Sequence, residues 1–154
     1  MKFKTLILVA LSLTVAGAVF AHSGATGVVK KRMDAMSDMG DRSKLVADMF
    51  KGKTEFDKAA IIDAVDAFVM HGSAMTELFP DTMDSRTGSK TEALPAIWEQ
   101  WDEFNDLVTE FVSKSETLQS TVSETDDSKV LKVEFFKTTK TCSGCHKRFR
   151  KPKD

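Results

Sequence analysis

Cys142-Ser143-Gly144-Cys145-His146 is the stretch on which the interpretation of the whole chain depends, and eight residues follow it. The pattern C-x-x-C-H is the attachment sequence of a c-type haem, in which both thiols add to porphyrin vinyl groups and the imidazole binds the iron. Cys145 and His146 follow Cys142 by three and four residues. In a helix of about 3.6 residues per turn, all three side chains leave one face. The segment therefore predicts a haem held by a helix near the end of the chain.

Two other interpretations of these cysteines remain open. A thioredoxin-like dithiol normally follows a strand and opens a helix, whereas the run from Lys129 to Thr141 has a helical pattern. A structural zinc ion needs four ligands, and beyond the motif the chain offers only His22 and His71, both distant in sequence. The chain has no other cysteine, so none is left over for a structural disulfide.

The N-terminal segment has the pattern of a secretory signal peptide. Lys2 and Lys4 precede an uncharged run over residues 5–20, and Val19 and Ala21 are small side chains at the positions that a signal peptidase reads. The run is shorter than the roughly 20 residues that a bilayer span needs, and no other stretch approaches that length. We therefore expect an exported, soluble protein without a membrane span. Covalent haem attachment takes place outside the cytoplasm, which agrees with export to the periplasm.

Removal of residues 1–21 leaves residues 22–154, a length typical of one domain. This domain carries 20 basic and 23 acidic residues, a net charge of −3. Mild acidity argues against a nucleic-acid partner, which calls for a basic patch with aromatic residues among it. A small basic cluster surrounds the haem motif: Lys147, Arg148, Arg150, Lys151 and Lys153. It is either a solvated helix end that complements the helix dipole or a docking site for an acidic redox partner.

Apolar residues with helical spacing predict the first two helices. The first runs from Gly27 to about Phe50, and Gly52 ends it. Thr54, followed by Asp57 three positions later, resembles a capping box. The second helix is expected to follow this box and to run to about Phe79.

Two further helices are predicted in the second half of the chain. Residues 81–91 contain almost no apolar side chain and predict a loop. The third helix is expected from Pro95, which suits a first helical turn, to about Val122. Asp126 or Asp127 can cap the fourth helix, which then reaches the haem motif. The apolar residues expected to face inward on this helix are Val130, Leu131, Val133, Phe135 and Phe136.

Four helices of about 20–25 residues joined by short connections predict an all-α fold, an antiparallel four-helix bundle. No segment has the alternating pattern of a strand, and no repeat is present. A haem on the fourth helix then lies between facing helices near one end of the bundle. Its apolar macrocycle becomes a large part of the core there.

The second axial ligand of the iron decides between two functions. A thioether gives a six-coordinate, low-spin iron suited to electron transfer, whereas an apolar side chain leaves a site open to small gases. The first helix contains four methionines, Met33, Met36, Met39 and Met49. From composition alone, flexible core packing is favoured over ligation for each of them.

Five segments together resemble the cytochrome c′ family, and the resemblance covers nearly all of the chain after residue 21. It is closest to the low-spin branch called cytochrome c-556, because Met36 stands four positions after the first-helix arginine. High-spin members usually have leucine, phenylalanine or tyrosine there. The segments are Val29-x-x-Arg32-x-x-x-Met36-x-x-Met39-Gly40, Phe56-Asp57-x-Ala59-Ala60, Leu78-Phe79-Pro80, Pro95-x-Ile97-Trp98 and Lys140-x-Cys142-x-x-Cys145-His146-x-x-Phe149-Arg150.

The resemblance implies roles for individual residues. Cys142 and Cys145 would form the two thioether bonds of one covalent haem c, His146 would be the proximal iron ligand and Met36 the distal one. Met39 matches a methionine that packs in the core of family members.

Two arginines would lie near the haem by the same resemblance. Arg32 stands one helical turn before Met36, and Arg150 one turn after His146, so both are candidates for contacts with a propionate or the haem edge. A solvated surface position is the alternative for each of them.

The two remaining histidines receive weaker interpretations. His71 is expected to be a partly exposed side chain of the second helix. His22 would be the N-terminal residue after cleavage behind Ala21, where its amine and imidazole can chelate copper, but no further ligand stands nearby in the sequence.

These observations predict a periplasmic mono-haem cytochrome that transfers electrons to and from redox partner proteins. No acid–base pair or substrate site is visible, so enzymatic activity is not expected. The alternative is a five-coordinate protein of the cytochrome c′ type that binds nitric oxide or carbon monoxide. Family members often dimerise through their first two helices, so a homodimer of that kind is an open alternative to a monomer.

Overall fold

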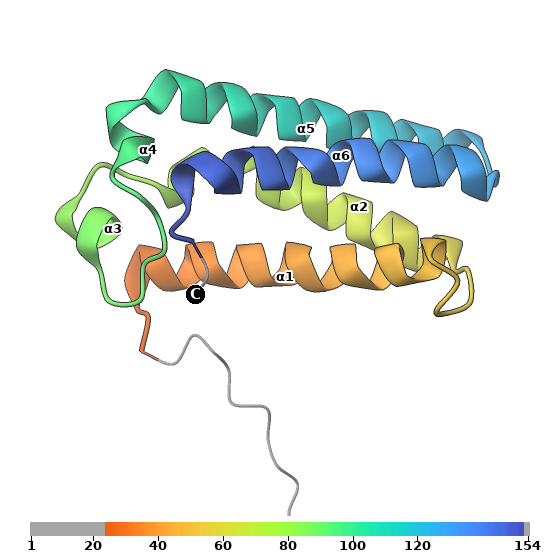
Figure 1. Cartoon of the computed structure of the whole chain (residues 1–154), viewed down its shortest axis with the longest axis horizontal. Coiled ribbons are helices and arrows are strands. Elements are labelled where there is room, and N and C mark those ends of the chain that lie inside the picture. The colour runs from red at the N-terminus through yellow and green to blue at the C-terminus, as the bar shows by residue number, and fades with distance from the viewer. Residues whose placement is uncertain (1–23, 153–154) are drawn as a thin grey trace, which may run out of the picture.

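Four long helices form an antiparallel bundle in the computed structural model, which describes residues 24–152 (Figure 1). Between the second and third of them the chain forms three short helical segments, and the described residues contain no strand, only an isolated bridge between Ala93 and Arg150. The predicted all-α bundle is confirmed. The elements are α1 (Gly27–Phe50), α2 (Lys58–Ser73), the 3₁₀ turn η1 (Thr76–Leu78), α3 (Met83–Thr87), α4 (Ala96–Glu99), α5 (Trp101–Glu124) and α6 (Ser128–Phe149).

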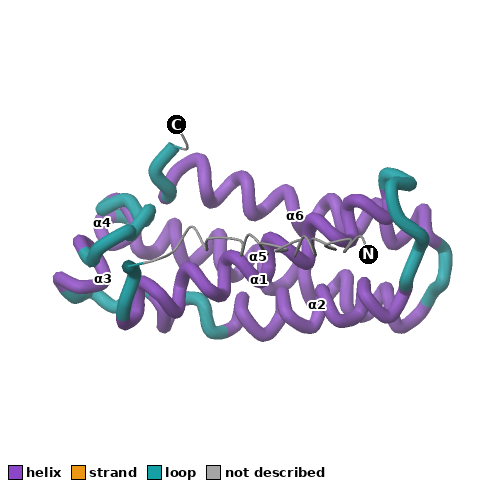
Figure 2. Tube along the Cα trace, turned by 90° about the horizontal axis from the view of Figure 1, so that it is seen from below, coloured by secondary structure: helices purple, strands orange, loops and turns teal. Residues whose placement is uncertain are grey.

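The connections gather at the two ends of the bundle (Figure 2). One end holds the α1–α2 and α5–α6 turns, and we call it the turn end. The other end holds α3, α4, the start of α1 and the last turns of α6 (Figure 1). Since C-x-x-C-H lies in those last turns, the motif is at the end where the irregular segments gather, which we call the motif end.

The core lies between the four long helices and is unevenly filled. Helix α5 packs extensively on α6 and on α2, and α2 packs on α1, whereas α1 and α6 touch each other much less. Each fully buried large apolar side chain contributes roughly 1.5–3 kcal/mol relative to an exposed one. The loose contact between α1 and α6 is what leaves room for a site at the motif end. Core side chains at most 1% exposed include Val46, Ile61, Phe68, Leu118 and Leu131.

Helix α1 begins and ends where the sequence predicts, and α6 begins at one of the two predicted caps. Gly52 follows α1 with a φ of 72°, a backbone conformation that glycine adopts without strain. Asp127 caps α6, and its Oδ1 accepts hydrogen bonds from the backbone N–H groups of Lys129 at 2.8 Å and Val130 at 3.4 Å. The helix that carries the haem motif therefore starts from a fixed point.

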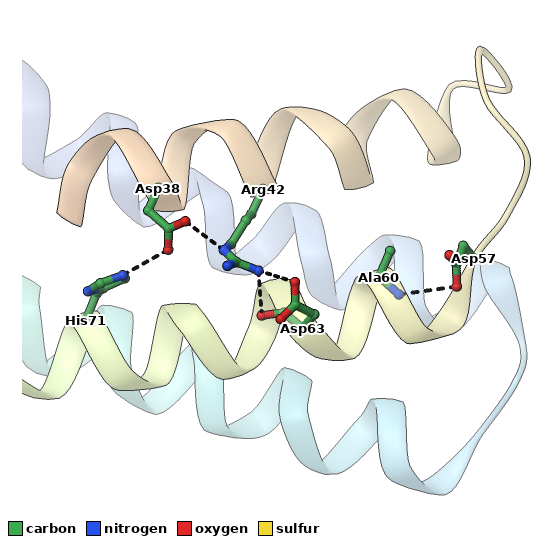
Figure 3. A network of polar contacts seen from close by, with 6 residues as sticks. All are labelled: Asp38, Arg42, Asp57, Ala60, Asp63 and His71. Atoms are coloured by element: carbon green, nitrogen blue, oxygen red, sulfur yellow. Dashed lines mark hydrogen bonds and ion pairs between the residues drawn. The ribbon is translucent and has the colours of Figure 1, made fainter. Parts of the chain in front are cut away.

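The predicted capping box at Thr54 is wrong. Helix α2 begins at Lys58, and Asp57 is its cap, accepting a hydrogen bond from the backbone N–H of Ala59 at 2.9 Å. Asp57 also accepts one from the N–H of Ala60 at 3.2 Å, which Figure 3 shows. The helix also ends earlier than predicted, at Ser73, because the chain turns into η1 before it reaches Phe79.

Two further predictions for the connecting segments need correction. Residues 81–91 are not simply a loop, since they include α3, whose first turn is capped by the Thr82 hydroxyl accepting from the Ser85 N–H. The third predicted helix is two helices, α4 and α5, which are separated at Gln100 by a non-helical backbone with φ −127° and ψ 49°. These irregularities lie at the motif end and shape the cavity described below.

The inward orientation predicted for five apolar residues of α6 is partly wrong. Leu131 and Phe135 are buried, but Val130, Val133 and Phe136 are 44%, 54% and 38% exposed. A helix turns by about 100° per residue, so five apolar side chains within seven positions cannot all face one neighbour.

A polar network ties α1 to α2 on the surface of the bundle (Figure 3). Nε2 of His71 lies 2.9 Å from Oδ2 of Asp38, and Arg42 donates to Asp38 and reaches across to Asp63. Burial raises the pKa of Asp38, but hydrogen bonds from His71 and Arg42 outweigh this and hold the pKa below its usual range. His71 is therefore a partly exposed contact between two helices, as the sequence suggests.

Candidate haem site

A cavity of about 350 Å³ opens at the motif end, between α1 and α6. Met33 and Met36 line it from α1, and Cys145, His146 and Phe149 line it from α6. Phe104 of α5 and four residues of the segment between α2 and α5 close the remaining sides. The four residues are Met75, Phe79, Ala93 and Ile97. The walls are mostly apolar, as suits a ligand with a large hydrophobic surface.

Helical spacing explains why the motif side chains reach this region. Leu131, Phe135, Thr138 and Phe149 are the buried residues of α6, and they lie on the same face. Cys142 and Cys145 are half-buried on it and pack against the core. His146, also half-buried, follows on the cavity side. The structure therefore brings Cys145 and His146, two of the residues expected to hold the haem, to the cavity.

The end of α6 is held in place by the segment before α4. The backbone N–H of Leu94 donates to the carbonyl of Phe149 at 2.9 Å, and the N–H of Lys151 donates to the carbonyl of Glu92 at 2.8 Å. These bonds satisfy backbone groups that a helix end would otherwise leave unpaired. They fix the distance between His146 and the wall formed by residues 91–97.

The two cysteine side chains are thiols in an apolar environment. Burial raises the pKa of the Cys145 thiol to about 11 and raises that of Cys142 as well. Redox-active dithiols need a stabilised thiolate with a lowered pKa, so this environment disfavours the dithiol interpretation. Among residues 24–152, no three or more candidate metal ligands form a group that could hold a metal ion.

Arg32 is a buried charge at the cavity and is only 5% exposed. Its Nη2 donates to the carbonyl oxygen of Ser85 at 3.0 Å and to Ser85 Oγ at 3.2 Å. Its guanidinium lies 4.3 Å from the centre of the Phe79 ring. Burial lowers the pKa of Arg32 to about 10, which leaves it charged at neutral pH.

Two N–H groups of Arg32 lack a partner. Nε and Nη1 are buried and donate to no hydrogen-bond acceptor among residues 24–152. Leaving such donors unsatisfied costs about 1–3 kcal/mol, and more when the group is charged. An anionic group in the cavity would remove this cost.

Arg150 also lines the cavity but already has a partner. Its Nε and Nη2 lie 2.6 and 2.5 Å from Oε2 of Glu92, which lines the cavity as well. The solvated surface position considered for both arginines is therefore wrong for Arg32, and Arg150 is a half-buried residue of an ion pair.

The basic cluster around the motif is largely engaged within the protein. Arg148 contacts Glu103 and Gln100 of the neighbouring segment, and Lys151 donates to the carbonyl of Thr91. Of the predicted cluster, Lys147 is exposed, and Lys153 lies outside the described residues. Arg148, Arg150 and Lys151 thus tie the end of α6 to neighbouring segments, although Arg148 and Lys151 stay exposed to solvent.

The methionines of α1 separate into two groups. Met39 and Met49 are 8% exposed members of the core, as expected for packing residues. Met33 and Met36 line the cavity, where Met75 is a third thioether. Sequence reasoning identified Met36, but it missed Met33, Met75, Ser85 and Glu92 as residues of this region. Ser85 and Glu92 stand in segments whose sequence has no period that would indicate which way a side chain points, and Met75 follows the end of α2, within the span predicted as helix.

The residues present fit a covalently bound haem in three respects. Two half-buried thiols and an imidazole come from one helix face, the cavity walls are apolar, and two buried Arg32 donors lack an acceptor. A haem supplies the vinyl groups, the apolar macrocycle and the propionate carboxylates that match these features.

Comparison with known proteins agrees with this fit. The family model described as cytochrome C′ matches residues 27–150. The chain belongs to the cytochrome c′ family. Membership confirms the prediction of haem c, the covalently bound cofactor of this family.

Relatives from both branches of the family resemble the chain. A cytochrome c′ of Rhodopseudomonas palustris is 33% identical over 144 residues, which are 91% of this chain and 95% of the relative. A cytochrome c-556 of Agrobacterium fabrum is 32% identical over 152 residues, or 97% of each chain. The solved structure of cytochrome c′ from Rhodopseudomonas palustris has a TM-score of 0.76 at 32% identity, covering 84% of this chain and 99% of the other.

Proposed function

We propose that this protein is a mono-haem electron carrier in which His146 and Met36 are the axial ligands of the iron. The observation that supports the proposal is the cavity itself, because Met36 from α1 and His146 from α6 line the same space. A thioether opposite an imidazole raises the reduction potential and favours electron transfer. Its partners would be redox proteins, and the protein would catalyse no reaction of its own.

Each residue of the site has a part in holding the cofactor. Bound haem supplies the one-electron Fe(III)/Fe(II) couple. Cys142 and Cys145 attach it to α6, and the hydrogen-bonded end of α6 keeps His146 oriented. The unsatisfied N–H groups of Arg32 would pair with a propionate carboxylate, and this would offset the cost of burying the arginine. Arg150 lies beside the same cavity, where its pair with Glu92 limits it to a haem-edge contact.

A gas-binding protein is the second candidate function. The Rhodopseudomonas palustris relative at 33% identity is named a cytochrome c′, and the family resemblance associates that name with a five-coordinate iron. In this case Met36 would line the cavity without binding the iron, and nitric oxide or carbon monoxide would take the open position.

The absorption spectrum of the purified holo-protein, oxidised and reduced, tests the choice of ligand. We expect a low-spin wild type with sharp α and β bands in the reduced state, and a high-spin Met36→Ala variant. Met33→Ala is the matched control, because it removes a thioether from the same cavity and should leave the spectrum unchanged. A high-spin wild type, unaltered by Met36→Ala, would contradict Met36 as the ligand.

Carbon monoxide added to the reduced protein separates the two functions further. A stable thioether ligand slows or prevents carbon monoxide binding to the wild type, and Met36→Ala should bind it readily. Rapid binding to wild type and variant alike would favour the gas-binding protein.

We further propose a periplasmic location. The expected signal peptide, residues 1–21, and His22 with its suggested copper chelation lie outside the described residues. Within residues 24–152, no helix is both long enough and apolar enough to cross a bilayer. Pairing of two copies through α1 and α2 stays a proposal, for which the 46% exposed Leu45 and 43% exposed Ile62 on these helices are candidates.

A further inference from the structure

The charge of the chain is divided between α6 and the rest of the bundle. Residues 128–152 contain eight basic residues and one acidic residue, Glu134. Residues 24–127 contain eleven basic and twenty-one acidic residues. The helix that carries the haem motif is therefore strongly basic, although the domain as a whole is mildly acidic.

The solvent face of α6 combines this charge with exposed apolar side chains. The buried face, with Leu131, Phe135 and Thr138, packs on α5. Side chains on the opposite face are exposed along the whole helix, among them Val133 and Phe136 at 54% and 38%. We call this face the α6 stripe. It consists of Lys129, Lys132, Val133, Phe136, Lys137, Lys140, Ser143 and Lys147.

Several lysines of the α6 stripe have no counter-charge. Lys137 pairs with Glu134, and Lys132 donates to the carbonyl of Phe50. The side chains of Lys129, Lys140 and Lys147 form no ion pair with any residue in the described part of the chain. Lys140 and Lys147 stand on either side of the haem-attachment segment, so positive charge is concentrated near the cofactor.

The neighbouring helix has the opposite charge. Helix α5 contains six acidic residues and one basic residue, Lys114. Of the acidic residues, Glu103 pairs with Arg148 of α6. The basic α6 stripe therefore lies beside an acidic helix. The charges of a partner must be complementary to the positions of these residues as well as to their sum.

We propose that the α6 stripe is the docking surface for an acidic redox protein, an inference that rests on the proposed electron-transfer function. Lysines speed the encounter with an acidic surface, while Phe136 and Val133 supply the apolar contact that an interface core needs. Electron-transfer complexes bury little surface, and one helix face is large enough for them. The partner then sits on the helix to which the haem is bound.

The sign of the salt dependence tests whether the local or the overall charge governs the encounter. Stopped-flow rates of reduction of the oxidised holo-protein are measured with ferrous EDTA, an anion, and with hexaammineruthenium(II), a cation. The net charge of −3 predicts repulsion of the anion, so its rate would rise with salt. The α6 stripe predicts that the anion's rate falls with salt. The cation is the reference, because the α6 stripe predicts that the cation's rate rises with salt.

Charge reversal then locates the surface. With a reduced plant-type ferredoxin as the acidic protein donor, Lys140→Glu/Lys147→Glu should lower the low-salt rate by roughly tenfold, within the range of electrostatic steering. Lys31→Glu/Lys44→Glu is the matched control, with the same change in net charge at exposed lysines of α1. Its rate should change by less than about twofold. Phe136→Ser should slow reduction by the ferredoxin but not by ferrous EDTA.

Three results would overturn the proposal. They are a rate for the anion that rises with salt, equal effects of the two double variants, and a salt-dependent self-association that Lys140→Glu/Lys147→Glu abolishes. The last result, seen by sedimentation, would assign the stripe to a second copy of the chain. A failure of the Met36 assignment is seen separately, because the spectrum reports the spin state and a five-coordinate haem can still be reduced in these assays.

Discussion

The turn end and the motif end of the bundle are built in different ways. At the turn end, Gly52 terminates α1, Asp57 and Asp127 cap the next helices, and the rings of Phe50 and Phe135 pack with centres 5.5 Å apart. Every one of these features follows a local rule for ending a helix or filling a core. We therefore expect the turn end to be stable without any ligand.

The motif end departs from those rules at several points. Arg32 is buried with two donors that find no acceptor among residues 24–152, and the helical backbone is interrupted at Gln100, between α4 and α5. Two thiols are half-buried there, and one of them, that of Cys145, lines the cavity. Proteins depart from local consistency mainly where function requires it. The difference between the ends therefore identifies the motif end as the site, independently of the family comparison.

Loss of the haem should produce the largest difference in stability between the two ends. The double variant Cys142→Ala/Cys145→Ala removes both attachment atoms, so we expect no covalently bound haem by mass spectrometry. Hydrogen exchange should then show protection reduced by about tenfold or more in α4 and the start of α5, roughly 1.4 kcal/mol of opening free energy. The α1–α2 turn should keep its protection.

Ser143→Ala is the control for this variant, because Ser143 is exposed between the two cysteines and should leave haem attachment unchanged. An equal loss of protection at both ends would mean that the haem stabilises the whole bundle. The conclusion that only the motif end depends on the haem would then be wrong.

Arg32→Met tests whether the buried charge at the motif end has an anionic partner in the holo-protein. If a propionate pairs with Arg32, the substitution should lower the free energy of unfolding by about 1–3 kcal/mol, measured with guanidinium chloride at pH 7. Without such a partner the charge is a cost, because its pKa of about 10 lies below the ordinary value. That cost is present below pH 10 and is relieved as the pH rises through 10. In that case Arg32→Met would stabilise the protein at pH 7, and the two interpretations predict opposite signs.

Arg42→Met is the control for the charge change, since Arg42 pairs with Asp38 and Asp63 on the surface. Its effect on stability should stay below about 1 kcal/mol, the usual limit for exposed ion pairs.

Features that depend on local patterns are predicted from the sequence more successfully than features that depend on distant contacts, for a physical reason. Helix α1, the start of α6 and the face shared by Cys142 and Cys145 depend on spacing and capping within a few residues, and these predictions are confirmed. Ser85 and Glu92 reach the site from segments without periodic apolar residues, through contacts 53 and 58 positions away in the sequence. Such contacts depend on the assembled bundle, so local patterns do not reveal them.

Local patterns also fail where two of them compete. Val130, Val133 and Phe136 are apolar and close to buried neighbours in sequence, but the position of α5 decides which face of α6 is covered. Thr54 and Asp57 are both good capping residues ahead of α2, and the helix begins after the second of them. In each case the sequence offers two local solutions and the tertiary structure selects one.

The choice between Thr54 and Asp57 gives the smallest predicted effect and a direct test of the turn end. Asp57→Ala removes the acceptor for the N–H groups of Ala59 and Ala60, so it should lower the free energy of unfolding by about 1 kcal/mol. Thr54→Ala is the matched control and should change stability by less than about 0.5 kcal/mol, because its hydroxyl caps no helix in the structure. Neither variant should alter the haem spectrum, since both positions lie at the turn end. Equal losses for the two variants in guanidinium denaturation would restore the capping box predicted from the sequence, and a changed spectrum would show that the two ends are coupled.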